Sequence, residues 1–215
     1  MLEKDLLIFD LDGTLADTRK DIAGAVNHAL EHLGLPVLDL HTITSFVGDG
    51  ITRLMQRALP DSAQDRLDEG LDFFHAYYSE HLADFSRPYA GVPETLAYFK
   101  NHKKAVFSNK QEKYTVALIE QLGLRPYFDF VLGGRPGLAP KPEGDGIHFL
   151  CRRLSCPPAT ALMIGDNTTD IRAGKAAGSS TCAVLYGYKD PATLLALRPD
   201  LVISSMEELK DFVKR

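Results

Sequence analysis

The sequence of 215 residues lacks any hydrophobic run that approaches the roughly 20 residues needed to cross a bilayer. Its first stretch, MLEKDLLIFD, places only the short run LLIF between charged residues, which is too short and too acidic for a signal peptide. We therefore expect a cytoplasmic protein that does not associate with membranes.

Positive charge is scarce relative to negative charge. The chain has 24 Lys and Arg residues against 29 Asp and Glu residues, a formal net charge of -5. This balance argues against a protein that neutralises nucleic-acid phosphates, although it permits a local basic pocket for a small anion. Any phosphate-bearing partner should therefore be a small molecule.

The sequence has only three cysteines, an odd number. Only Cys151, Cys156 and Cys182 are present, and the C-x4-C spacing of the first two matches none of the usual zinc signatures. We interpret all three as reduced, mostly buried thiols.

Two regions of different pattern follow one another, and the length suits one domain with an insertion. From about residue 18 to about residue 82 the apolar spacing is helical, and it predicts helices over 22–33 and 51–59 and a third that ends near Leu82. RPYAGVP, from Arg87 to Pro93, is interpreted as a linker.

From Pro93 onward, short apolar runs alternate with amphipathic helical segments. The expected strands are KAVFSN, FDFVLGG, ALMIGD, TCAVL and DLVIS, joined in one sheet by LLIF from the start of the chain. This alternation predicts an α/β fold with a doubly wound parallel sheet. Residues 1–16 and 88–215 would form this core, and residues 17–87 an all-helical insertion.

Polar side chains follow several of these strands. Asp10 follows LLIF, Ser108 and Asn109 follow KAVF, and Asp166 follows ALMIG, while Lys141 lies in the loop after FDFVLGG. The carboxyl ends of parallel strands meet in one crevice, so these groups should converge and hold a hard cation such as Mg²⁺. Any single one could instead cap a turn or helix, but the ordered set argues against that explanation.

The segments D-x-D-G-T, S-N-K, K-P and G-D-x-x-x-D, in this order, resemble the four motifs of the haloacid dehalogenase superfamily of aspartate-nucleophile phosphatases. The resemblance covers the whole chain. RPYAGVPETL, GDNTTDIRAGKAAG and LYGY are similar to the phosphoglycolate phosphatases, whose helical cap lies between the first and second motifs. The resemblance implies a Mg²⁺-dependent phosphatase that hydrolyses a small phosphomonoester, such as phosphoglycolate, through an aspartyl-phosphate.

The resemblance also implies roles for the acidic residues. Asp10 would be the nucleophile and a metal ligand. Asp12 would be the general acid/base, with its main-chain carbonyl on the metal. Asp166 would complete the metal site, and Asp170 would orient metal-bound water.

The other motif residues would bind the phosphoryl group. Gly13 would allow a tight turn, and its amide and that of Thr14 would face the phosphoryl oxygens. Ser108, Asn109 and Lys141 would hold the transferring group, and Lys141 would also steady Asp10.

Substrate choice depends on less specific signals. The loop VGDGITR is similar to a cap segment that faces the active site in related phosphatases, and Arg53 in it is a candidate for binding an anionic tail. Arg135 and Pro136 stand where many relatives have acidic residues, which could redirect substrate preference. The aromatic residues between Phe73 and Tyr78 are interpreted as core of the helical insertion.

Three alternatives stay open from the sequence. A pyrophosphatase or a phosphomutase of the same superfamily would share every motif. A phospho-aspartate signalling module would also use an aspartate and a lysine on a parallel sheet, but it would leave the insertion of roughly seventy residues unexplained. The expected assembly is a monomer or a homodimer.

Overall fold

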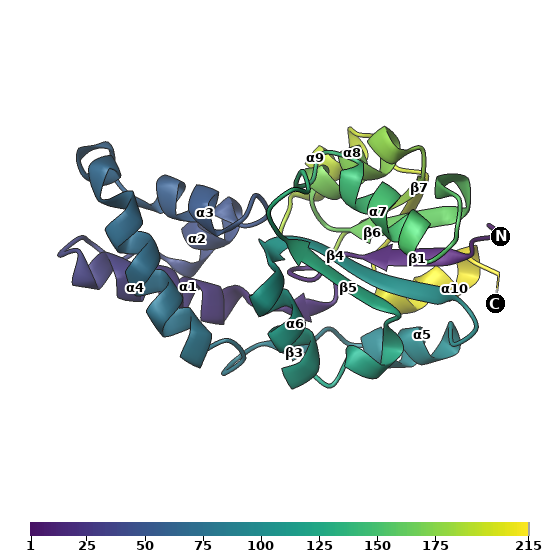
Figure 1. The fold of residues 1–215 in the computed structure, drawn as a ribbon, viewed down its shortest axis with the longest axis horizontal. Helices are drawn as coiled ribbons and strands as arrows, with labels where there is room; N and C mark the ends of the chain where they lie inside the picture. Colours follow the sequence, from purple (N-terminus) through teal and green to yellow (C-terminus); the bar gives the residue numbers. More distant parts are fainter. Residues whose placement is uncertain (215) are drawn as a thin grey trace.

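The fold is known from a computed structural model, which describes residues 1–214. Six parallel strands form one sheet in the order β5-β4-β1-β6-β7-β8 (Figure 1). The strands are β1 Leu6–Phe9, β4 Lys103–Gln111, β5 Phe130–Gly134, β6 Ala161–Gly165, β7 Ser180–Val184 and β8 Leu201–Ile203. The parallel sheet confirms the predicted α/β class.

Helices cover both faces of the sheet, which makes it doubly wound. Leu6 and Ile8 pack in the apolar cluster that includes α7 and α8, whereas Leu7 and Phe9 pack in the cluster that includes α5, α6 and α10. These helices are α5 Val92–Tyr98, α6 Glu112–Gln121, α7 Asp145–Arg153, α8 Thr168–Ala177 and α10 Leu209–Phe212, with the short α9 Pro191–Leu195 near α8. Burial on both faces explains why β1 is a continuous apolar run.

The order of strands reverses beside β1. From β1 the chain continues outward through β4 and β5, then crosses to β6 on the other side of β1 and continues through β7 to β8. Ligands bind at such a reversal, outside the carboxyl ends of the strands. Asp10 and Asp166 directly follow β1 and β6, so the sheet directs both carboxylates to this crevice.

Four helices lie together beyond the carboxyl ends of the strands, at the left of Figure 1. They are α1 Arg19–His32, α2 Leu40–Phe46, α3 Ile51–Ala58 and α4 Leu67–Glu80. The three expected helices are therefore present, and α2 is an additional one. The chain enters and leaves this group through a two-stranded antiparallel pair, β2 Ala16–Asp17 and β3 Arg87–Pro88. Below, "the helical group" means α1 to α4 with their connecting loops.

The helical group has its own apolar interior, in which Phe74 and Tyr78 are fully buried. Phe73 and Tyr77 are only half-buried, because they lie on another side of α4. The interpretation of the aromatic residues as core therefore holds fully for two of the four.

The structure differs from the sequence expectations at two connections. The expected linker is largely regular structure, since Arg87–Pro88 pair in β3 and Val92 begins α5. Strand β4 continues to Gln111, beyond the expected end at Asn109, with a register shift against β5 after Phe107. Such an irregularity bends a strand and re-aims its side chains.

Two other expectations were tested directly. All three cysteines are free and buried, as predicted. Within residues 1–214, no helix has the length and apolar character that a membrane span requires.

Candidate active site

The turn after β1 brings the first motif against the sixth strand. Gly13 has φ of +83°, and a Cβ at this position would lie 2.3 Å from Oδ2 of Asp166. Only glycine fits here, both for its backbone conformation and for its lack of a side chain. The turn thus brings Asp10 close to Asp166.

Asp10 is held by one of its two carboxylate oxygens. Oδ1 accepts a hydrogen bond from the Leu11 amide (2.7 Å) and forms an ion pair with Nζ of Lys141 (2.9 Å). Among the described residues, no hydrogen bond or ion pair engages Oδ2. Asp10 lines a cavity at the carboxyl ends of the strands, so this oxygen is the one available to a ligand.

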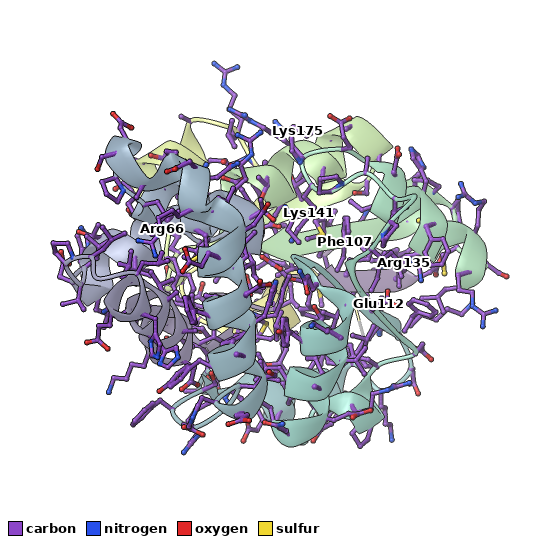
Figure 2. The ribbon with its side chains drawn as sticks, turned by 60° about the vertical axis from the view of Figure 1, so that its left-hand side comes forward. Arg66, Phe107, Glu112, Arg135, Lys141 and Lys175 are labelled. Atoms are coloured by element: carbon purple, nitrogen blue, oxygen red, sulfur yellow. The ribbon has the colours of Figure 1, made fainter. Side chains whose placement is uncertain are left out.

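Lys141 is buried between two carboxylates. Its Nζ contacts Asp10, Oδ1 of Asp170 (2.6 Å) and the carbonyl of Phe107 (2.9 Å), near which it lies in Figure 2. Burial lowers the pKa of Lys141, but the two aspartates outweigh it and leave the pKa above its ordinary value. All three ammonium hydrogens have protein partners. Lys141 therefore steadies Asp10 as expected but, contrary to expectation, has no hydrogen left for a phosphoryl group.

Asp10, Asp166 and Asp170 form a cluster of carboxylates. Each offers one oxygen within 4.8 Å of the others, and all three are buried. Thr14 Oγ1 and the Tyr188 amide hold the two oxygens of Asp166, at 2.7 and 2.8 Å. Burial, with the nearby charges of Asp10 and Asp170, raises the pKa of Asp166 to about 8. Burial likewise raises the pKa of Asp10, although Lys141 opposes the shift.

This cluster fits a hard divalent cation. Three carboxylates in a buried space carry more negative charge than Lys141 alone offsets, and oxygen donors of this kind suit Mg²⁺. Asp170 also caps α8, since its Oδ2 accepts from the Asn167 amide (2.8 Å). That bond fixes the orientation of the Asp170 carboxylate.

Asp12 does not belong to the carboxylate cluster. Its Oδ1 accepts from the Thr18 hydroxyl (2.7 Å), and its Oδ2 pairs with Nζ of Lys110 (2.9 Å). Lys110 also donates to the hydroxyl of Tyr78 on α4 (2.9 Å). Asp12 is thus held from the sheet side by Lys110 and from the start of the helical group by Thr18.

Three expected phosphoryl contacts are occupied by protein partners instead. The Gly13 amide donates to the Ala16 carbonyl (2.9 Å) and the Thr14 amide to the Leu11 carbonyl (3.3 Å), because the turn closes on itself. The Asn109 side chain exchanges two hydrogen bonds with the backbone of Lys141 (2.8 and 2.9 Å). Asn109 therefore positions Lys141.

Ser108 differs from Asn109 because its hydroxyl group is not fully engaged. Its Oγ accepts a hydrogen bond from the Lys110 amide (3.2 Å), and the residue lines the cavity. The hydroxyl hydrogen is left to donate to a ligand.

The cavity that Asp10 lines lies between the sheet and the helical group. Its floor comes from the strand ends and its roof from the helices. The floor residues are Asp10, Asp12, Ser108, Asn109, Lys110, Asp166, Asn167 and Tyr188, and the roof residues are Ile22, Val47, Gly48, Gly50, Ile51, Leu54, Phe74 and Tyr78. The floor is polar and charged, whereas the roof is almost entirely apolar.

Two floor asparagines hold the roof loop Val47–Gly50. Asn109 Nδ2 donates to the Gly48 carbonyl (3.0 Å), and Asn167 Nδ2 donates to the Val47 carbonyl (3.3 Å). Gly48 has φ of +126°, and a Cβ there would lie 2.1 Å from Asn167 Nδ2. The loop that was expected to face the site does so.

Two arginines singled out from the sequence do not line this cavity. Arg53 is exposed on α3 and does not line the cavity, so its binding of a substrate tail stays a prediction that this structure does not support. Arg135 pairs with Glu112 (3.4 Å), near which it lies in Figure 2, and its guanidinium lies over the ring of Phe149 (4.5 Å). Arg135 therefore does not contribute to the cavity walls.

Sequence reasoning missed several residues of the site, although each lies inside a quoted segment. They are Thr18 in FDLDGTLADT, Tyr78 among the α4 aromatic residues, Lys110 in S-N-K, Asn167 in GDNTTD and Tyr188 in LYGY. Their contacts join separate segments, and only Lys110 carried a chemical signal of its own as a lysine directly after a predicted strand.

The comparisons with known proteins agree with this geometry. A family model described as haloacid dehalogenase-like hydrolase matches residues 7–184. Phosphoglycolate phosphatase of Chromobacterium violaceum is 41% identical over 213 residues, which cover 96% of this chain and 95% of that protein. Phosphoglycolate phosphatase of Neisseria meningitidis is 37% identical and covers 94% of this chain and 90% of its own. The chain belongs to the haloacid dehalogenase-like hydrolase family.

A solved structure extends the agreement to the whole fold. The crystal structure of a predicted phosphoglycolate phosphatase from Haemophilus somnus 129pt superposes with a TM-score of 0.91 at 29% identity and covers 99% of each chain. The helical group is therefore shared with that structure.

Proposed function

We propose that this protein is a Mg²⁺-dependent phosphatase that hydrolyses small phosphomonoesters, phosphoglycolate above all, through an aspartyl-phosphate on Asp10. The observation that carries the proposal is the state of Asp10. One oxygen is fixed by Leu11 and Lys141, the other has no protein partner among the described residues, and Asp10 lines the cavity. A carboxylate oriented in this way is ready to act as a nucleophile.

The metal would be held by Asp10, Asp166 and Asp170, together with the main-chain carbonyl of Asp12. When bound, Mg²⁺ offsets the repulsion between these carboxylates and an incoming phosphate dianion. The two contacts of Lys141 hold Asp10 and Asp170 in place in this structure.

The protein side chains divide the chemistry between them. Oδ2 of Asp10 attacks phosphorus as the bond to the ester oxygen breaks. Asp12 enters this step in its protonated form and donates that proton to the ester oxygen, so the alcohol leaves. Asp12 then takes a proton from the water that attacks the aspartyl-phosphate, which releases phosphate and restores Asp10. Ser108 donates its free hydroxyl hydrogen to a phosphoryl oxygen.

The closed roof of the cavity is the reason to propose a small substrate. Apolar side chains of α1, α3 and α4 close the cavity over the strand ends and exclude water from the reacting groups. The names of the relatives support phosphoglycolate as the substrate to test first.

The proposal is tested by a substrate panel assayed with Mg²⁺ and with excess chelator. The panel contains phosphoglycolate, ethyl phosphate, p-nitrophenyl phosphate, pyrophosphate and a hexose 1-phosphate. We expect hydrolysis of the monoesters, highest kcat/KM for phosphoglycolate, and no activity in chelator. Preferential cleavage of pyrophosphate, transfer of phosphate within the hexose, or a phosphoryl group that stays on the protein for hours would each contradict it.

A further inference from the structure

We infer that Lys110 and Tyr78 together bind a carboxylate on the substrate, and so select phosphate esters of a short hydroxy acid over esters with a neutral tail. The inference rests on the proposed function and names the part of the cavity that chooses the substrate. Lys110 lies on the floor of the cavity and Tyr78 on its roof.

Charge in the cavity singles out Lys110. Among the residues that line the cavity in the described part of the chain, Lys110 is the only lysine or arginine. Its side chain is 4% exposed, so its charge acts in a largely water-free space. Lys141 lies behind the cavity wall with all its hydrogens engaged, and Arg53 is exposed outside it.

Unused hydrogen-bond donors point to the same place. Lys110 has three ammonium hydrogens, of which Asp12 and Tyr78 accept two. Because Tyr78 accepts from Lys110, its own hydroxyl hydrogen is left over, and no described residue accepts it. The two donor atoms lie 2.9 Å apart. A carboxylate, with two oxygens on one carbon, accepts from two such neighbouring donors.

The position of Lys110 relative to Asp12 sets the length of the substrate tail that the site accepts. In the proposed function Asp12 protonates the ester oxygen, and Nζ of Lys110 lies 2.9 Å from Asp12 Oδ2. In phosphoglycolate the carboxylate carbon is two bonds from that ester oxygen. A carboxylate at this distance reaches Lys110 and Tyr78, whereas a longer tail would run into the apolar roof at Leu54 and Phe74.

A neutral tail would leave both donors unsatisfied in a closed site. Buried donors without acceptors cost free energy, so the analogue that lacks the carboxylate should bind less well. Ethyl phosphate, which carries a methyl group where phosphoglycolate has its carboxylate, is therefore the matched comparison.

The experiment measures the ratio of kcat/KM for phosphoglycolate to that for ethyl phosphate, with Mg²⁺, in wild type, Tyr78→Phe and Lys110→Met. We expect a wild-type ratio of about 100 or more, a drop of about tenfold in Tyr78→Phe and a larger drop in Lys110→Met. Tyr77→Phe is the matched control. Tyr77 lies on α4 between His28 and His81 and does not line the cavity, so its variant should keep the wild-type ratio.

Binding is measured separately in the Asp10→Asn background by calorimetry with both esters. We expect Tyr78→Phe to weaken phosphoglycolate binding and to leave ethyl phosphate binding nearly unchanged.

A wild-type ratio near one would overturn the inference while the phosphatase assignment stands. So would an unchanged ratio in both variants with both esters slowed equally, because Lys110 would then only position Asp12. Hydrolysis of neither ester by wild type would instead refute the proposed function.

Discussion

The floor and the roof of the cavity are built in opposite ways. On the floor, charged side chains such as Asp10 and Asp166 sit at the ends of buried strands, and nearly every polar atom has an assigned partner. On the roof, the apolar side chains Ile22, Leu54 and Phe74 come from three separate helices, α1, α3 and α4, and contribute shape without charge. Tyr78 is the one roof side chain with a polar group, and its hydroxyl accepts a hydrogen bond from Lys110 on the floor.

The difference teaches where chemistry and selection reside. A pre-organised set of charges needs rigid elements, which the central strands provide. Selection among substrates needs only a wall that admits some tails and not others, and helices inserted outside the sheet can change without disturbing the strands. We therefore expect changes on the floor to abolish reaction and changes on the roof to reduce it.

The largest effect is expected from Asp10→Asn, which removes the nucleophile from the floor. The amide is a far weaker nucleophile, so kcat should fall on the order of 10⁴-fold or more. The measurement is initial-rate kinetics with phosphoglycolate and Mg²⁺. Asp211→Asn, an exposed change on α10, is the control and should keep wild-type activity.

Lys141→Met tests whether the floor is held together by its buried cation. Without Lys141, Asp10 and Asp170 become neighbouring buried carboxylates with no countercharge, so the free energy of unfolding should fall by about 3–5 kcal/mol in chelator. Urea denaturation measures it. Lys175→Met, at an exposed lysine in Figure 2, should cost far less, and an equal loss for both variants would contradict the role of Lys141.

Metal binding should stabilise the floor in a pH-dependent way. The raised pKa of Asp166, about 8, means that the folded chain keeps a proton that the unfolded chain loses above about pH 4. Without metal, this group therefore lowers stability as pH rises from about 4 to about 8. Mg²⁺ compensates the ionised carboxylates, so its effect on Tm should be larger at pH 8.5 than at pH 5.5.

The size of that effect follows from mass action. Mg²⁺ at about 100 times its Kd contributes about 2.7 kcal/mol. For a chain of this length the gain raises Tm by about 5–10 °C. Thermal denaturation at the two pH values measures it, with Asp166→Asn as the control that should lose most of the shift. An equal shift at both pH values would argue against the carboxylate cluster as the metal site.

A smaller effect is expected from the roof change Gly48→Ala. The new Cβ would collide with Asn167 and displace the loop Val47–Gly50, so kcat/KM should fall by about tenfold while the phosphoenzyme still forms. Gly34→Ala is matched in having a positive φ but has open space around it, so it should lower stability without this loss. If Gly48→Ala lowered activity as much as Asp10→Asn does, the distinction between the floor and the roof would be wrong.

The sequence predicted the floor better than the roof for a physical reason. The residues Asp10, Ser108 and Asp166 directly follow apolar runs, and the parallel sheet brings the ends of those runs together. The roof depends on how α1, α3 and α4 pack, which no local pattern specifies. Arg53 was selected for its charge, yet the helical packing leaves it outside the cavity.

The sequence also could not show which polar side chains already have hydrogen-bond partners within the protein. Lys141 and Asn109 were expected to contact the phosphoryl group, but both lie where loops and strand ends already supply partners. Lys110 lies within the irregular part of β4, and only the folded strand shows that its side chain reaches Asp12 and Tyr78.

The central claim, that Asp10 carries the phosphoryl group, is tested most directly by acid quench during turnover of phosphoglycolate with Mg²⁺, followed by proteolysis and mass spectrometry. We predict a phosphorylated peptide that contains Asp10, formed within the first turnover and absent in Asp10→Asn. A phosphoryl group on any other residue, or turnover without a phosphorylated peptide in wild type and with normal rate in Asp10→Asn, would contradict the account.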